Sequence, residues 1–315
     1  MIQETLPFNS NLPVLVIGAA GVDIVGRLKG DLLPGSSIPS YIRFSYGGAA
    51  RNVAENLARL GQDVIMITAV GLDDTGDRLL QQAKNAGINI DYALRSPQHP
   101  TGAYIAVLNS AGKLVHAMDD MRVITMLTKE NIQKHAELFK QVSILFLDSN
   151  LPNETLRTAI GLAKRAGIKI VADPTSTVLA PRLFPYLSDL FLMTPNRAEA
   201  AIFCGMPKPI RGRRIALASA KNLVSQGVDV AIITMAESGL CYATSETSGY
   251  IPAIRTDVLD PTGAGAALTS AIIFGFLNNI PLDEAVRLGV SAASLTLRYE
   301  GTVVPDLTLE KLYNQ

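Results

Sequence analysis

Short apolar runs alternate with amphipathic segments along most of this chain, and this alternation constrains its fold most strongly. Four segments with helical periodicity lie between strand-like runs: Ala50–Leu60, Asp77–Ala86, Asn153–Ala166 and Ile215–Gln226. Six runs rich in Val, Ile and Leu are typical of buried strands: Val14–Gly18, Val64–Ala69, Ile144–Asp148, Ile168–Ala172, Leu190–Met193 and Val230–Thr234. The 315 residues therefore predict an α/β fold, a doubly wound and mainly parallel sheet flanked by helices, as one domain over 1–315.

Polar residues lie at or just after the ends of several predicted strands. They are Asp148, Asp173, Asn196 and Thr234. Ligands of open parallel sheets bind beyond the carboxyl ends of the strands. We therefore expect these four side chains at one rim of the sheet.

Two segments, Ile38–Tyr46 and Gly102–Met118, alternate polar and apolar residues instead of forming apolar runs. The second contains a turn sequence at Asn109-Ser-Ala-Gly112. Both flank a candidate site, so we predict a small β lid built from about 35–47 and 100–120. A surface meander without a gating role is the alternative.

Charge and cysteine content exclude several classes of function. The chain has 28 basic and 28 acidic residues, so no strong field attracts nucleic acid or a membrane surface. No apolar run is long enough to span a bilayer. Cys204 and Cys241 lack a CxxC partner and predict reduced thiols in a cytoplasmic protein. The three histidines are too scattered for a zinc site or a catalytic triad.

A glycine-rich turn, Asp260-Pro-Thr-Gly-Ala-Gly-Ala266, precedes an apolar helix-like segment. Such a turn lets backbone N–H groups converge on an anion at a helix N-terminus, where the helix dipole also favours negative charge. This geometry suits a transferring phosphoryl group. The residue after Gly265 stands where a carboxylate would take the proton of an attacking hydroxyl, and that residue is Ala266.

Two further motifs suit the recognition of hydroxyl groups. Gly47 and Gly48 precede a helix, and Asn52 lies on its first turn, where the amide can bridge hydroxyls. A tight turn before a helix is the alternative. Asp23 follows the first strand and the small-residue loop Gly18-Ala-Ala-Gly21, so its carboxylate could accept from vicinal hydroxyls. A helix cap or a loop salt bridge is equally compatible.

Two motifs on the second half of the chain are compatible with a nucleotide site. In Asn196-Arg-Ala-Glu199 the spacing of three puts both polar side chains on one face of a helix start, and Glu199 could hold Mg²⁺ through water. A capping box explains the same spacing. Thr234-Met-Ala-Glu-Ser-Gly239 lies between two strand-like runs, where it is a plain hairpin or a turn that receives a nucleotide phosphate.

Together these motifs resemble the ribokinase or PfkB-type family of carbohydrate and nucleoside kinases. The resemblance rests on Gly47-Gly48…Asn52…Leu60-Gly61, Val70-Gly71-Leu-Asp73-Asp-Thr-Gly76, Asn196-x-x-Glu199 and Asp260–Gly265. It implies a ribokinase-like fold whose β lid closes over the sugar and often forms a homodimer. It also implies ATP-dependent phosphorylation of a sugar or nucleoside hydroxyl with Mg²⁺ and a monovalent cation. The segment Gly48–Gly61 looks most like the pseudouridine kinase branch.

The resemblance also implies roles for individual residues. Substrate contacts are expected from Asp23, Gly47, Gly48, Asn52, Asp148 and Asn150. Nucleotide contacts are expected from Asn196, Thr234, Gly239 and Thr262, with Glu199 binding Mg²⁺ through water. The anion hole is expected from the backbone amides of Gly263, Ala264 and Gly265, beside the base position Ala266.

Three positions depart from the family pattern. Ala266 replaces the catalytic carboxylate, Ala236 stands where the turn usually has glycine, and Ala271 replaces a helix glycine. Loss of a general base typically lowers a rate by about 10²–10⁴. The chain is then a kinase of reduced activity, a non-catalytic pseudokinase that binds a sugar or nucleoside, or an engineered Asp-to-Ala variant. Three departures at one site favour natural divergence. A dinucleotide binder is disfavoured because no G-x-G-x-x-G follows the first strand.

Overall fold

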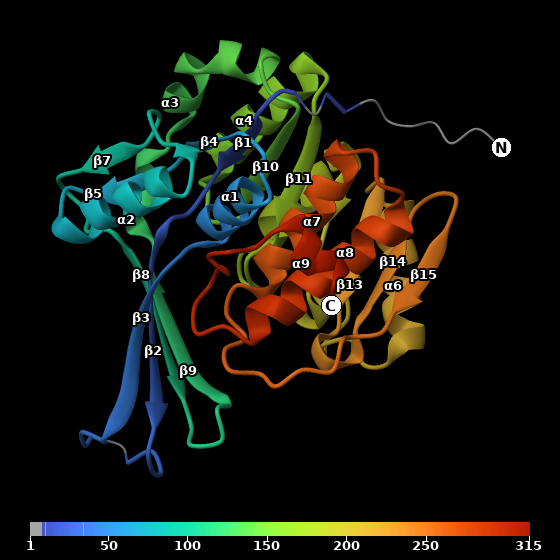
Figure 1. Cartoon of the computed structure of the whole chain (residues 1–315). Coiled ribbons are helices and arrows are strands. Elements are labelled where there is room, and N and C mark those ends of the chain that lie inside the picture. The colour runs from blue at the N-terminus through green and yellow to red at the C-terminus, as the bar shows by residue number, and fades with distance from the viewer. Residues whose placement is uncertain (1–7, 10, 34) are drawn as a thin grey trace.

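A mixed nine-stranded sheet forms the centre of the fold in the computed structural model, which describes residues 8–9, 11–33 and 35–315 (Figure 1). The strand order is β15-β14-β13-β12-β11-β10-β1-β4-β6, with parallel neighbours except for the two hairpins at the β15 end. The strands are β1 (Val14–Ile17), β4 (Val64–Ile67), β6 (Ile88–Asn89), β10 (Ile144–Asp148), β11 (Lys169–Asp173), β12 (Leu192–Met193), β13 (Val230–Thr234), β14 (Leu240–Ala243) and β15 (Ser248–Ile251).

Helices cover both faces of this sheet, because successive residues of its buried strands point to opposite sides. In β1, Val14 and Val16 belong to one apolar core, and Leu15 and Ile17 belong to the other. The first core is closed by α1 (Ala49–Arg59), α2 (Asp74–Asn85), α7 (Ala264–Leu277), α8 (Leu282–Leu297) and α9 (Leu309–Tyr313). The second is closed by α3 (Lys129–Lys134), α4 (Asn153–Ala166), α5 (Arg197–Phe203) and α6 (Arg213–Ser225).

The predicted doubly wound α/β fold is confirmed. Each predicted strand or helix of the main sheet corresponds to an observed element within a few residues. One run was wrong in detail, since Val64–Ala69 is divided between β4 and β5 (Ala69–Gly71), which pairs with β7 (Leu94–Ser96) in a separate sheet. The predicted rim forms because β10, β11, β12 and β13 are adjacent and parallel.

A second sheet projects from the body of the molecule, and we call it the lid sheet (Figure 1). Its order is β3-β2-β8-β9, with β2 (Gly21–Leu28), β3 (Ser40–Gly47), β8 (Gly102–Leu108) and β9 (Leu114–Asp120). Alternating polar and apolar residues predict the last three of these strands, whereas the region of β2 is expected to be a loop that bears Asp23. Asp23 in fact lies within β2, because Gly21–Arg27 pairs with β3 on one side and with β8 on the other.

The lid sheet has one polar and one apolar face. Strand register places Ser45, Asp23, Tyr104 and Asp119 in a row across its four strands. Asp23 is buried, so this polar face looks toward the body. The large apolar side chains of the opposite face include Ile42, Phe44, Ile105 and Met118, all exposed.

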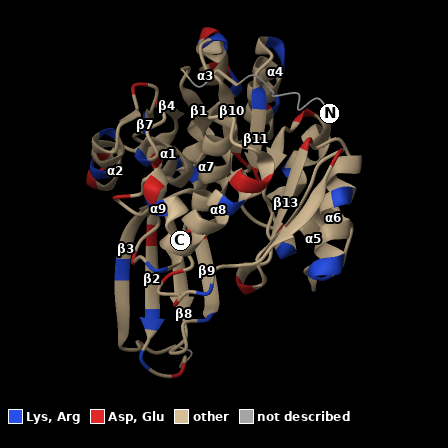
Figure 2. Ribbon diagram, turned by 45° about the vertical axis from the view of Figure 1, so that its right-hand side comes forward, with Lys and Arg blue, Asp and Glu red and all other residues tan. Residues whose placement is uncertain are grey.

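The distribution of charge agrees with the neutral composition. Figure 2 shows Lys and Arg interspersed with Asp and Glu along the ribbon. Within the described ranges, no helix is both long and apolar enough to cross a membrane.

Candidate active site

The glycine-rich turn leads into α7, as predicted. Gly263 is the N-cap of this helix with φ of 85°. A Cβ on Gly263 would lie 2.0 Å from the carbonyl oxygen of Thr302, so the position requires glycine. The amides of the first turn, including those of Ala264 and Gly265, have no acceptor within the helix. They form a concave set of donors at the positive end of a 14-residue helix, which suits a phosphate group.

Ala266 lies on the side of α7 that packs against α1. One turn later, the Ser270 hydroxyl donates to the carbonyl of Val53 in α1, at 3.2 Å. The Ala266 side chain is buried in the apolar core to which α1 and α7 both contribute. A methyl group there accepts no proton. Asp260 does not obviously replace it, because its carboxylate accepts from the Thr262 amide and from Arg43.

The predicted sugar-binding residues meet where α1 begins beside β2. A Cβ on Gly47 would lie 2.3 Å from the Asp23 carboxylate, so glycine allows the strand end to approach this acid. Burial raises the pKa of Asp23 to about 6, opposed by the positive charges of Arg51 and Arg43 and reinforced by Asp260. Asn52 is buried on the first turn of α1. Asp23 and Asn52 therefore provide an acceptor and a donor close to the anion hole.

Asp148, for which the resemblance implies a secondary substrate contact, is fully buried. Its Oδ2 accepts from the amides of Ala19 and Ala50 at 2.8 and 3.1 Å, and its Oδ1 accepts from the Asn150 amide at 2.9 Å. A substrate contact needs exposed surface that Asp148 lacks. The carboxylate instead fixes the start of α1 against the end of β1.

Asn150 is partly exposed and lines a cavity of about 590 Å³ beside the lid sheet. Asp119 and Arg122 line the same cavity from the end of β9 and the loop that follows it. Asp119 also ends the polar row that begins near Asp23. This row extends the candidate substrate site away from the anion hole.

Three of the four predicted nucleotide residues, Asn196, Thr234 and Gly239, line a second cavity of about 820 Å³, and Thr262 is not among its lining residues. Asn196 and Thr234 form an isolated parallel bridge at its edge, and Gly239 closes the hairpin between β13 and β14. Ala264 and Gly265 line the same cavity, so the anion hole opens into it. Its apolar wall includes Val258, Leu268, Val290 and Leu297. An apolar wall with few polar groups suits a flat heterocycle.

The Asn196–Glu199 motif forms the capping box that was the alternative explanation. Asn196 Oδ1 accepts from the amides of Ala198 and Glu199 at 2.8 and 3.1 Å, and Glu199 Oε2 accepts from the Asn196 amide at 2.9 Å. Burial and the nearby negative charge of Asp173 raise the pKa of Glu199. A buried carboxylate beside a second acid is the setting in which a cation stabilises the charged form.

Comparison with known proteins decides the family. The pattern of the pfkB family carbohydrate kinases matches residues 12–309. The chain belongs to the PfkB family. Pseudouridine kinase of Escherichia coli K12 is 30% identical over 297 residues, which cover 94% of each chain. A carbohydrate kinase from Agrobacterium tumefaciens superposes with a TM-score of 0.80 at 27% identity, over 96% of both chains.

A more distant PfkB structure supports the fold. Ribokinase of Arabidopsis thaliana complexed with ribose and ATP superposes with a TM-score of 0.80 at 21% identity, over 96% of this chain and 98% of that one. PfkB kinases use ATP, and the larger cavity with its anion hole fits such a nucleotide. Glu199 Oε2 accepts the capping hydrogen bond from the Asn196 amide, which leaves Oε1 for a ligand. A carboxylate oxygen is a hard ligand, so Glu199 fits Mg²⁺ held through water.

Ala236 departs from the PfkB pattern in a way that the backbone makes visible. It has φ of 51°, in the left-handed region where glycine is favoured. The hairpin therefore has the backbone conformation expected for the glycine that the resemblance implies at this position. Ala271 is fully buried in α7 and packs in the core.

Several site residues were not identified from the sequence. Arg43 pairs with Asp260, Arg51 contacts Asn52, and Tyr104 lies between Asp23 and Asp119 on the lid sheet. Arg43 and Tyr104 occupy polar positions of alternating strands, which is a detectable signal. The position of Arg43 and Tyr104 beside the site depends on strand register, which residue spacing in the sequence does not reveal.

Proposed function

We propose that this chain binds a nucleoside, pseudouridine or a close analogue, together with ATP and Mg²⁺. It transfers the γ-phosphoryl group to a primary hydroxyl at a much reduced rate. Asp23, Gly47, Gly48 and Asn52 hold the sugar. Asn196, Thr234, Gly239 and Thr262 serve the nucleotide, and Glu199 holds Mg²⁺ through water.

One observation carries this proposal: the start of α7 separates two candidate sites. Ala264 and Gly265 line the nucleotide cavity, whereas Ala266 faces α1, which bears Asn52. A phosphate held by the α7 amides would therefore lie between a nucleotide and a hydroxyl substrate. Phosphoryl transfer depends mainly on such positioning and on electrostatic stabilisation.

Pseudouridine is the proposed substrate because the Escherichia coli relative is named a pseudouridine kinase. The cavity of about 590 Å³, lined by Asn150, Asp119 and Arg122, provides space and polar groups for a base attached to the sugar. Free ribose has no base, so water would fill this cavity when ribose is bound.

A non-catalytic binding protein is the second candidate, and Ala266 favours it. The anion hole does not depend on the lost carboxylate, so binding can survive without transfer. Natural divergence explains Ala266 better than an engineered replacement, because Ala236 and Ala271 depart from the PfkB pattern at the same site.

The lid sheet supports two further parts of the proposal. Its polar face carries Asp23 toward the body, so we infer that it closes over the sugar. Its exposed apolar face, with Ile42 and Phe44, fits a homodimer in which two such faces pack together. The free thiols of Cys204 and Cys241 fit a reducing compartment, and we infer the cytoplasm.

The test is restoration of the base. Calorimetry should detect binding of pseudouridine and of a non-hydrolysable ATP analogue with Mg²⁺ by the unaltered chain. Ala266→Asp should raise pseudouridine phosphorylation by about 10²–10⁴, the contribution of a general base. Ala266→Asn is the matched control, because it has the same shape and cannot take the proton.

The outcomes separate the candidates. An Ala266→Asp protein that binds both ligands but transfers nothing would favour the non-catalytic function. If the unaltered chain and Ala266→Asp both fail to bind the nucleotide analogue, the nucleotide-site assignments are wrong. Ribose binding without pseudouridine binding would reject the nucleoside.

A further inference from the structure

We propose that Arg51 is a positioning residue that orients Asn52 and couples the lid sheet to the anion hole. This inference rests on the proposed binding roles of Asn52 and Gly263. Arg51 lies in the first turn of α1 and is only 2% exposed. A guanidinium so deeply buried is rare unless its donors are satisfied by defined partners.

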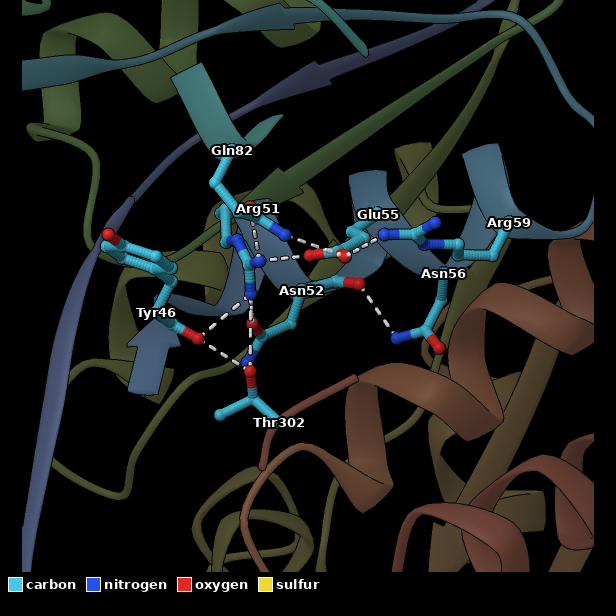
Figure 3. A network of polar contacts seen from close by, with 8 residues as sticks. All are labelled: Tyr46, Arg51, Asn52, Glu55, Asn56, Arg59, Gln82 and Thr302. Atoms are coloured by element: carbon cyan, nitrogen blue, oxygen red, sulfur yellow. Dashed lines mark hydrogen bonds and ion pairs between the residues drawn. The ribbon is translucent and has the colours of Figure 1, made fainter. Parts of the chain in front are cut away.

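One nitrogen of Arg51 serves three separate parts of the site. Its Nη1 donates to the carbonyl of Tyr46 at 2.9 Å, to Asn52 Oδ1 at 2.9 Å and to Thr302 Oγ1 at 3.2 Å (Figure 3). Tyr46 belongs to β3 of the lid sheet. Thr302 belongs to the segment that follows α8. Arg51 therefore joins elements that are far apart in the sequence.

The contact with Asn52 determines what that amide offers to a substrate. A guanidinium only donates hydrogen bonds, so the atom of Asn52 that faces Arg51 must be the carbonyl oxygen. The NH₂ group of Asn52 is left to donate to a ligand. With the Asp23 carboxylate as acceptor, the site then offers one donor and one acceptor to neighbouring hydroxyls.

The contact with Thr302 extends to the anion hole. The Thr302 hydroxyl donates to the Tyr46 carbonyl at 2.6 Å. The Thr302 carbonyl lies so close to Gly263 that no side chain fits at that position. Movement of the lid strand at Tyr46 would therefore act on Thr302, and through Thr302 on the first residue of the phosphate-binding helix.

The Nη2 group of Arg51 also holds its guanidinium in place, whereas its buried Nε has no hydrogen-bond partner among the described residues. Its Nη2 bonds Glu55 and donates to Gln82 Oε1 at 2.7 Å. Gln82 Nε2 in turn donates to Glu55 Oε1 at 2.9 Å, and Arg59 donates to the same oxygen at 3.1 Å. Lysine has one nitrogen with three donors, so it cannot reproduce this set of contacts while keeping the charge.

The test compares Arg51→Lys with Thr302→Val and with Arg59→Lys as the matched control. Arg59 shares Glu55 with Arg51 but has no bond to Asn52, Tyr46 or Thr302 among the described contacts. Calorimetry measures pseudouridine affinity with and without a saturating non-hydrolysable ATP analogue and Mg²⁺. Hydrogen–deuterium exchange measures peptides covering 40–47 and 260–266 in the unliganded proteins.

Arg51→Lys should weaken pseudouridine binding about tenfold, the scale of a lost hydrogen bond to a charged group. It should also reduce the effect of the nucleotide analogue on pseudouridine affinity. Thr302→Val should reduce that mutual effect while leaving the Arg51–Glu55 pair intact. Exchange should rise in both peptides in both variants and in neither peptide of Arg59→Lys.

A folded Arg51→Lys protein with unchanged affinities and unchanged exchange in both peptides would overturn the inference. If Arg51→Lys does not fold, Thr302→Val decides, and unchanged exchange at 260–266 rejects the coupling. The exchange measurement needs no ligand. Failure of the unaltered chain to bind pseudouridine would therefore reject the proposed substrate without deciding the role of Arg51.

Discussion

Arg43 of the lid sheet forms an ion pair with Asp260 at the start of the phosphate-binding turn. Asp260 is only 2% exposed, and its Oδ1 also accepts from the Thr262 amide at 2.9 Å. The two residues are separated by 217 positions in the chain. The pair therefore fastens the polar face of the lid sheet directly to the segment that precedes the anion hole.

Arg43→Met should weaken pseudouridine binding about tenfold, because it removes a charged hydrogen bond and leaves the Asp260 carboxylate buried without its cation. Dissociation should account for most of the change, since the lid sheet loses its attachment. Calorimetric titration measures the change in affinity, and stopped-flow mixing measures the change in dissociation rate. Arg27→Met is the control on the same sheet, where the guanidinium bonds the Ser110 carbonyl. Equal effects of both variants would contradict a specific role for the Arg43–Asp260 pair.

Pseudouridine affinity should increase as pH rises through the range where Asp23 ionises. Burial raises the pKa of Asp23 to about 6, so the carboxylate that accepts from two hydroxyls is formed only above that pH. Calorimetry from about pH 5 to about pH 7.5 should show this dependence. Asp23→Asn should lose it, whereas Asp119→Asn on the same polar row should keep it. A pH profile that Asp23→Asn leaves unchanged would remove Asp23 from substrate binding.

Glu199→Gln should selectively weaken the binding of the magnesium complex of the nucleotide. Glutamine also completes a capping box, so α5 is preserved while the negative charge is lost. We expect about a tenfold loss of affinity with Mg²⁺ and little change without it. Burial and Asp173 raise the pKa of Glu199, so the difference from the unaltered chain should shrink as pH falls. Glu237→Gln, which changes an exposed carboxylate that lines the nucleotide cavity, is the control.

Phe44→Ser should convert a homodimer to monomers if the apolar face of the lid sheet is the interface. Phe44 is 70% exposed, a large apolar area for a single side chain. Tyr41→Ser is the matched control, because Tyr41 is 68% exposed but lies on the opposite face of the same strand. Sedimentation velocity at micromolar concentration measures the state of each variant. An unaltered chain that sediments as a monomer would exclude the dimer.

Ala236→Gly should stabilise the protein by about 1 kcal/mol. Ala236 lies in the left-handed region with φ of 51°, where alanine is less favourable than glycine by about this amount. Thermal or urea unfolding measures this change in the free energy of unfolding. Ala198→Gly, in α5, should destabilise by a similar amount, about 0.5–1 kcal/mol, because glycine is unfavourable within a helix. A stabilised Ala198→Gly would show that neither change acts through the backbone conformation.

Local patterns in the sequence were sufficient for the sheet and for several motifs. The runs Ile144–Asp148 and Val230–Thr234 and the helix Asn153–Ala166 match the observed elements residue for residue. The turn before α7 was recognisable because glycine at 263 and a following apolar helix act over a few residues. The capping box at Asn196 was readable for the same reason, and the Mg²⁺ contact of Glu199 stays a prediction.

The lid strand β2 could not be recognised, because its hydrogen-bonding partners β3 and β8 lie elsewhere in the chain. Burial of Asp148 could not be recognised either, since its three amide donors come from the β1–β2 region, α1 and its own loop.

The sequence by itself determined the α/β fold and the glycine-rich turn before α7, because these depend on periodicity and on residue identity. It also predicts that this turn binds phosphate and that Ala266 replaces a carboxylate. Only the tertiary structure decided that Arg43 meets Asp260 and that Arg51 joins Asn52 to Tyr46 and Thr302. Such contacts depend on strand register and helix packing, which bring distant residues together without leaving a local pattern.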